Sequence, residues 1–207
     1  MYFLLLGFFT GLSLILALGA QNIFVMEQGL KKQYIFLVCL ICSISDLILI
    51  FLGIFLFEFF KHYFTNIVEL ILNILLLIFL IYFIISKIKF KYKETDLYSD
   101  QRTNSLKNVI FKTIGFTYLN PHVYSDTVFF LGNFSKNFFI IHKYLFGLGA
   151  SISSFIFFFF LGYLSNYLSK YLNNPKTWKA INSFIIIFMS SLSLYVLIEI
   201  FTKATEL

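Results

Sequence analysis

The sequence predicts an all-α integral membrane protein, built as one domain over residues 1–207 from a bundle of six transmembrane helices. Hydrophobic residues make up 59% of the chain and charged residues only 13%, and the mean hydropathy is +0.87. A soluble domain carries about 25% charged residues, so this chain lacks a polar shell. Six charge-poor windows are each long enough to cross a hydrocarbon core of about 30 Å, and they leave no room for a soluble domain.

The six windows define the expected helices in order. Windows 1–26, 144–169 and 180–198 are uncharged, while windows 33–57, 64–86 and 113–135 each hold a single charged residue, namely Asp46, Glu69 and Asp126. The first window lacks the basic n-region of a secretory signal and has a far longer apolar run, so we expect it to be retained. Helices are expected at residues 2–26, 33–57, 64–86, 109–131, 144–168 and 179–201.

The connections predict how the bundle is oriented. Taken on alternate sides, they hold twelve Lys and Arg residues on one side and four on the other. Because cytoplasmic loops carry the basic excess, the richer side is expected in the cytoplasm and both termini outside. The net charge of +6 is then mainly a topology signal, and we expect no nucleic-acid partner.

The longest connection, roughly residues 87–112, divides the chain into two groups of three helices. Because three is odd, related halves would have to lie in opposite orientations in the membrane. This is the inverted-repeat plan of many secondary transporters. We therefore expect two inverted three-helix halves, on helix count alone, since no strong sequence repeat relates them.

Asp46 lies near the midpoint of the second window. A charged side chain there costs about 2.5 to 3.5 kcal/mol on insertion scales, so it is expected to serve a function. Cys39, Cys42 and Ser43 form a small, mildly polar face around it. The alternative is that Asp46 bonds to a neighbouring helix as a packing device.

The fourth window predicts a broken helix at Asn120-Pro121. Proline lacks an N-H, and its ring crowds the carbonyl of Thr117 one turn earlier. In lipid, broken helices survive only where they face protein or a wet cavity. Asn120, His122 and Asp126 are therefore candidate lining groups, with His122 and Asp126 on one face. The alternative is a simple kink satisfied by Thr117.

Two carboxamides, Gln21 and Asn22, follow Gly19-Ala20 within the first window and are also candidates for a binding site. The glycines of the first and fifth windows are interpreted as helix-packing positions. Cys39 and Cys42 match a CxxC spacing, but they lie inside an apolar helix with no feature that would activate a thiol. The sequence contains no phosphate-binding loop, HExxH motif or nucleophile elbow, so we expect no cofactor and no enzyme.

Four segments together resemble the LysE family of amino-acid exporters. They are GLSLILALGAQNIFVMEQG from Gly11 to Gly29, the pair Ser45-Asp46, NPHVYSDTV from Asn120 to Val128, and FGLGASISS from Phe146 to Ser154. The four segments occur in the order expected for the family and span nearly the whole chain. The combination of GAQN with NPHVY is similar to that of the branch that exports lysine and arginine. The resemblance implies a multi-pass exporter in a bacterial cytoplasmic (inner) membrane, with a cationic amino acid as substrate.

Residues and resemblance together suggest a mechanism. Asp46 and Asp126 would pair with the substrate cations, with hydrogen bonds from Gln21, Asn22 and Asn120, and half-helix N-termini at the Pro121 break would attract the substrate carboxylate. Proton antiport is the expected drive, with Asp46, Asp126 and His122 as candidate coupling groups.

Other readings stay open at this point. They are a divalent metal-cation exporter using the same carboxylates with His122, an exporter of other amino acids, a membrane thiol-disulfide enzyme and a structural membrane subunit. A homo-oligomer is also open.

Overall fold

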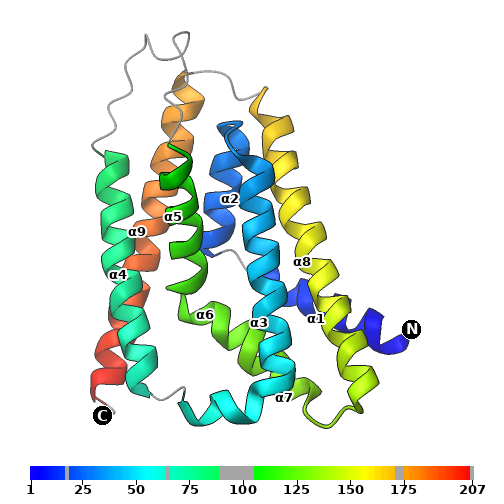
Figure 1. The fold of residues 1–207 in the computed structure, drawn as a ribbon. Coiled ribbons are helices and arrows are strands. Elements are labelled where there is room, and N and C mark those ends of the chain that lie inside the picture. The colour runs from blue at the N-terminus through cyan, green and yellow to red at the C-terminus, as the bar shows by residue number, and fades with distance from the viewer. Residues whose placement is uncertain (17–18, 64–65, 89–104, 171–174, 206–207) are drawn as a thin grey trace.

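In the computed structural model, all regular secondary structure among the described residues is helical, as the sequence predicts (Figure 1). Those residues are 1–16, 19–63, 66–88, 105–170 and 175–205. Most of the long basic connection predicted at residues 87–112 therefore lies outside them. In chain order the elements are α1 (Tyr2–Ile15), α2 (Ala20–Leu30), α3 (Ile35–Tyr63), α4 (Asn66–Ile88), α5 (Leu106–Tyr118), α6 (Pro121–Tyr124), η2 (Ser125–Phe130), α7 (Leu131–Ser135), α8 (Ile140–Ser169) and α9 (Pro175–Thr205).

Three of the described helices, α3, α8 and α9, are long and apolar enough to cross a membrane. The bent pair α1 and α2 would count as a fourth span, and α4 contains a shorter apolar stretch, Leu70–Ile85. This supports a multi-pass membrane protein. The count of six spans and the inverted halves stay predictions.

The helix ends gather at two opposite ends of the bundle (Figure 1). One end holds the turn from α2 to α3, the ends of α4 and α8, and the starts of α5 and α9. The opposite end holds the end of α3, the start of α4 and the turn from α7 to α8. The first of these, which we call the basic end, is the one whose connections carry most of the Lys and Arg residues. The orientation of the termini stays a prediction.

The first predicted helix, residues 2–26, is divided in the structure. α1 ends at Ile15, Gly19 is extended (φ −118°, ψ 177°), and α2 leaves at 83° to α1. Glycine is a weak helix former, and a break frees carbonyl groups that need a donor in a dry environment. The Asn22 side-chain nitrogen donates to the Ile15 carbonyl at 3.0 Å, which satisfies one of them.

The break expected at Asn120-Pro121 is present. α5 ends at Tyr118, Asn120 is extended (φ −84°, ψ 110°), and α6 starts at Pro121. The Tyr124 hydroxyl donates to the Tyr118 carbonyl at 2.9 Å. The Thr117 hydroxyl instead donates to the Thr113 carbonyl in its own helix. Tyr124, rather than Thr117, therefore supplies the donor across the break.

Glycine positions bring helices into backbone contact, which confirms the packing role predicted for Gly149 but not for Gly19, whose Cβ would meet nothing within 4 Å. A Cβ at Gly149 in α8 would overlap the Leu4 carbonyl oxygen of α1, so the two backbones touch. In α3, a Cβ at Gly53 would lie 2.5 Å from the Val128 Cα of η2. These contacts hold α1 against α8 and η2 against α3. The second contact brings η2, which carries Asp126, against α3, which carries Asp46.

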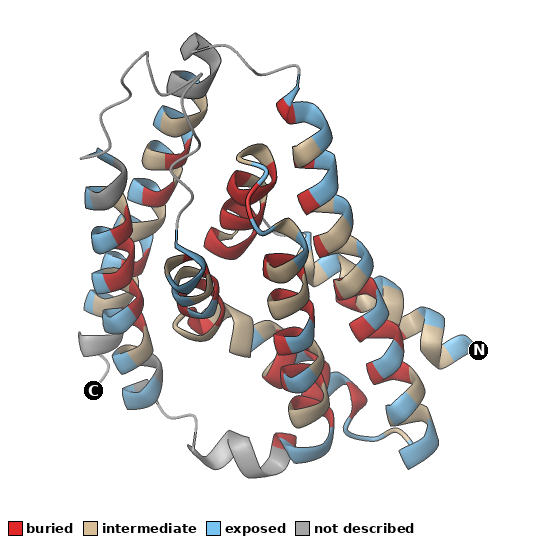
Figure 2. Ribbon diagram, turned by 45° about the horizontal axis from the view of Figure 1, so that its top comes forward, coloured by how far each residue is buried: buried red, intermediate tan, exposed pale blue. Residues whose placement is uncertain are grey.

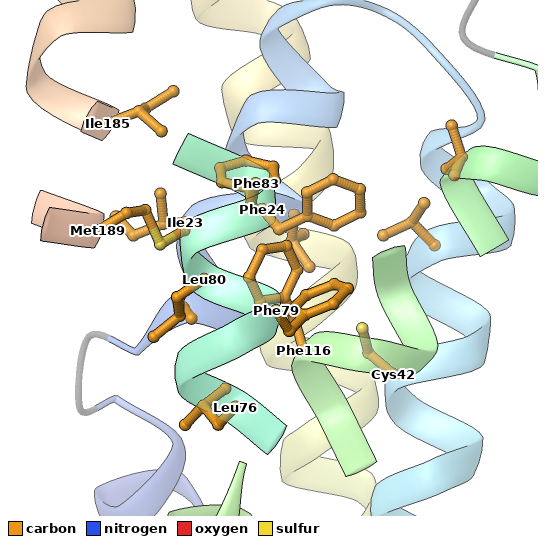
Figure 3. Packing of buried hydrophobic residues seen from close by; sticks show 14 of the residues in the cluster. Ile23, Phe24, Cys42, Leu76, Phe79, Leu80, Phe83, Phe116, Ile185 and Met189 are labelled. Carbon is orange, nitrogen blue, oxygen red and sulfur yellow. The ribbon is translucent and has the colours of Figure 1, made fainter. Parts of the chain in front are cut away.

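The core surrounds α2, which is buried on nearly every side (Figure 2). Beside it, Phe24 of α2, Phe79 and Phe83 of α4, and Phe116 of α5 form an aromatic cluster (Figure 3). The Phe116 ring centroid lies 4.8 Å from that of Phe79, 5.0 Å from Phe83 and 5.2 Å from Phe24. We call these four side chains the phenylalanine cluster.

Candidate functional site

A cavity of about 310 Å³ lies where the two helix breaks meet in the interior of the bundle. This volume is at the lower end of the range typical of small-molecule sites. Its apolar wall includes Leu76 of α4 and Leu192 and Val196 of α9. Its polar wall brings together every lining residue expected from the sequence: Gln21, Asn22, Asp46, Asn120, His122 and Asp126.

Asp46 reaches the cavity from the middle of α3 and is 3% exposed. The Ser154 hydroxyl of α8 donates to its Oδ2 at 2.7 Å. A hydrogen bond to an ionised carboxylate is stronger than a neutral one, so Ser154 both holds the carboxylate and stabilises its charge. Sequence analysis did not assign Ser154 to the site, because two residues 108 positions apart in the chain give no local sign of a contact.

Asp126 lies in η2, a π-helical segment. Such segments widen the helix by one residue per turn and are frequent at functional sites. His122, four residues earlier in α6, also lines the cavity, as the shared-face prediction requires. The close approach of Gly53 to η2 places this segment against the helix that carries Asp46. The two carboxylates therefore face one cavity.

The first turn of α2 forms another part of the polar wall. Gln21 and Asn22 are both mostly buried there, and the first N-H groups of a helix have no intrahelical partner. The Gln21 side-chain nitrogen is buried without a hydrogen-bond partner among the described residues. Asn22 is engaged with the Ile15 carbonyl. The start of α2 thus offers donors to an anionic group in the cavity.

The first turn of α6 offers fewer donors than the sequence suggested. Pro121 has no N-H, the His122 N-H donates to the Asn120 Oδ1 at 3.1 Å, and the Val123 N-H donates to the Asn120 carbonyl at 3.2 Å. Asn120 caps the helix with its side chain, a role for which this residue type is well suited. Asn120 therefore fixes the geometry of the break as well as lining the cavity.

Cys39 and Cys42 are free and buried, and the Cys39 thiol donates to the Phe158 carbonyl at 3.2 Å. This is the environment of a packing cysteine. Among the residues that the structure describes, no group of three His, Cys, Asp or Glu side chains could hold a metal ion.

The phenylalanine cluster lies between the cavity and the basic end of the bundle. Leu76 of the cavity wall is on α4 below Phe79 and Phe83 in Figure 3. All four rings are at most 5% exposed, and the Lys112 ammonium lies 5.4 Å from the centroid of Phe83. Glu27 of α2, also buried, forms an ion pair with Lys31. The four rings do not line the cavity themselves but pack beyond Leu76 of its wall.

Comparison with known proteins places this architecture in a family. The family model described as LysE type translocator matches residues 12–200. The chain belongs to the LysE family. Membership confirms the resemblance found in the GAQN and NPHVY motifs. The chain is therefore a transporter rather than an enzyme, and it is a multi-pass bacterial membrane protein.

Similar LysE-type proteins cover almost the same length. The chain is 35% identical to the Arginine exporter protein ArgO of Pectobacterium atrosepticum, over 86% of this chain and 88% of the relative. It is 33% identical to the protein of the same name from Pectobacterium carotovorum, over 91% and 93%. It is 32% identical to that from Salmonella typhimurium, over 85% and 84%. No solved structure matches the chain.

Proposed function

We propose that this protein exports arginine, and lysine as a related cation, from the bacterial cytoplasm by proton antiport. The observation that carries the proposal is the cavity in which Asp46 and Asp126 face one space beside two helix breaks. Relatives over most of the chain are named arginine exporters, and arginine is a substrate with two cationic groups and one carboxylate.

The cavity has complementary groups for each end of such a substrate. Asp46, held by Ser154, would pair with the α-ammonium. The first turn of α2, with the unpaired Gln21 amide nitrogen, would receive the neighbouring carboxylate, since a helix N-terminus favours negative charge. Asp126 would pair with the guanidinium or the lysine ammonium. The carboxylate site at α2 replaces the one expected at the Pro121 break, where the first N-H groups are already bonded.

Export of a cation from a cell that is negative inside requires work of about 2.3 kcal/mol per 100 mV for each charge. Exchange of one substrate cation for one proton moves no net charge. A carboxylate such as Asp46 that must release the substrate before it takes up a proton would couple the two flows. His122, on the same wall, is a further candidate for proton transfer.

Alternating access would require the cavity to open to each side in turn. We propose that the basic end faces the cytoplasm, following the excess of Lys and Arg there, and that the phenylalanine cluster is the closed cytoplasmic gate. Each predicted three-helix half begins with a broken segment, α1–α2 in the first and α5–α7 in the second. Broken helices at corresponding positions support an inverted repeat.

The test is efflux from proteoliposomes that contain the full chain and are preloaded with labelled arginine or lysine. An inward proton gradient is expected to stimulate efflux, and a neutral amino acid on the inside is expected not to compete. Protein-free liposomes measure the leak. Absence of arginine and lysine efflux from folded protein would refute the proposed function, and gradient-independent efflux would refute antiport alone.

A further inference from the structure

Glu199 of α9 is an acidic residue that lies one turn beyond the cavity wall. Leu192 and Val196 line the cavity, and residues at positions i, i+4 and i+7 share one face of a helix. Glu199 continues that face, and its side chain is only 17% exposed. A mostly buried carboxylate in an apolar helix is a candidate functional group.

The Glu199 carboxylate is directed toward His122. The distance from His122 Nε2 to Glu199 Oε2 is 3.8 Å, and the His122 ring centroid lies 5.8 Å from that of Tyr195, one turn before Glu199 on α9. His122 belongs to the cavity wall and precedes Asp126 by four residues. A row of ionisable side chains thus runs from Asp126 and His122 in the cavity wall to Glu199 just beyond it.

We propose that Glu199 is a second acidic contact for the side-chain cation of the substrate, beyond Asp126 on the same path. The position of His122 Nε2 marks where a nitrogen of a ligand can approach this carboxylate. A planar guanidinium, which carries several N-H donors, is suited to bridge two carboxylates. When the substrate extends toward α9, its guanidinium displaces His122 from Glu199.

This inference rests on the proposed function and adds to it. With the carboxylate and α-ammonium of arginine bound at the α2 turn and Asp46, the guanidinium lies at the far end of the molecule. Asp126 and Glu199 then contact only that end. Glu199 thereby contributes to selection for a substrate with a cationic side chain, while His122 competes with the substrate for the same carboxylate.

The test is the dissociation constant of arginine for the purified full chain, measured by isothermal titration calorimetry. Glu199→Gln is expected to raise it about tenfold, the effect of about 1.4 kcal/mol, and Glu199→Asp less. His122→Gln is expected to lower it, because the competing group is removed. Citrulline has the same α-amino and carboxylate groups but an uncharged side chain, so its binding should not change in Glu199→Gln. Tyr195→Phe is the matched control on the same helix face.

A double variant separates binding from positioning. If Glu199 only orients His122, Glu199→Gln will have no effect in the His122→Gln background. If it binds the substrate, the loss of arginine affinity will persist there. Unchanged arginine affinity in Glu199→Gln, with wild type binding normally, would overturn this inference alone. Failure of the wild type to bind arginine would overturn the proposed function instead.

Discussion

Replacement of Asp46 by Asn tests the central electrostatic claim with little change in shape. Asn has nearly the same volume, and its Oδ1 can still accept the hydrogen bond that Ser154 donates to Asp46 Oδ2 at 2.7 Å. What is lost is one negative charge on a side chain that is 3% exposed. We therefore expect the variant to fold and to fail in transport.

The size of the effect follows from the interaction of two unit charges. At 4 Å and an effective dielectric constant of 20, a carboxylate and a substrate cation attract by about 4 kcal/mol. Part of this is offset by the cost of removing both charges from water. A net loss of about 3 kcal/mol corresponds to a fall of more than about a hundredfold in kcat/KM for arginine.

The assay is initial efflux of labelled arginine from proteoliposomes over a range of internal concentrations, with the amount of folded protein measured by size-exclusion chromatography. Ser154→Ala is the matched variant, because it removes the donor and leaves the charge. It is expected to reduce kcat/KM by about ten- to a hundredfold, since a hydrogen bond to a charged group contributes about 1.5 to 3 kcal/mol. Transport by Asp46→Asn within threefold of wild type would refute the reasoning.

Three further variants test the fold and the gate. Gly149→Val should lower the melting temperature in detergent by several degrees, because its Cβ would overlap the Leu4 carbonyl. Gly19→Ala is the control, because a Cβ there meets nothing within 4 Å. Equal melting temperatures for the two variants would contradict the packing. Tyr124→Phe removes the donor at 2.9 Å across the second break and should destabilise the protein by about 1 to 3 kcal/mol, measured by thermal unfolding; a smaller effect would mean that another donor replaces it. Phe116→Ala should open the phenylalanine cluster and give arginine flux without a proton gradient in proteoliposomes, whereas flux that still requires the gradient would argue against this gate.

Much of the fold could be predicted because its signals are local. Crossing lipid requires runs of apolar residues, so hydropathy predicts where helices lie. The break at Asn120-Pro121 was predictable for the same reason, since proline removes an N-H wherever it occurs. The cost of a buried acid likewise identified Asp46 and Asp126 as candidate site residues before any contact was known.

Contacts between distant segments could not be predicted in this way. The division between α1 and α2 has no proline to mark it, and it depends on Asn22 reaching back to the Ile15 carbonyl. The bond from Ser154 to Asp46 joins α8 to α3, and the approach of Glu199 to His122 joins α9 to α6. Hydropathy and helix periodicity describe one segment at a time, whereas these contacts depend on how helices pack. Only that packing directs polar groups from separate helices into one cavity.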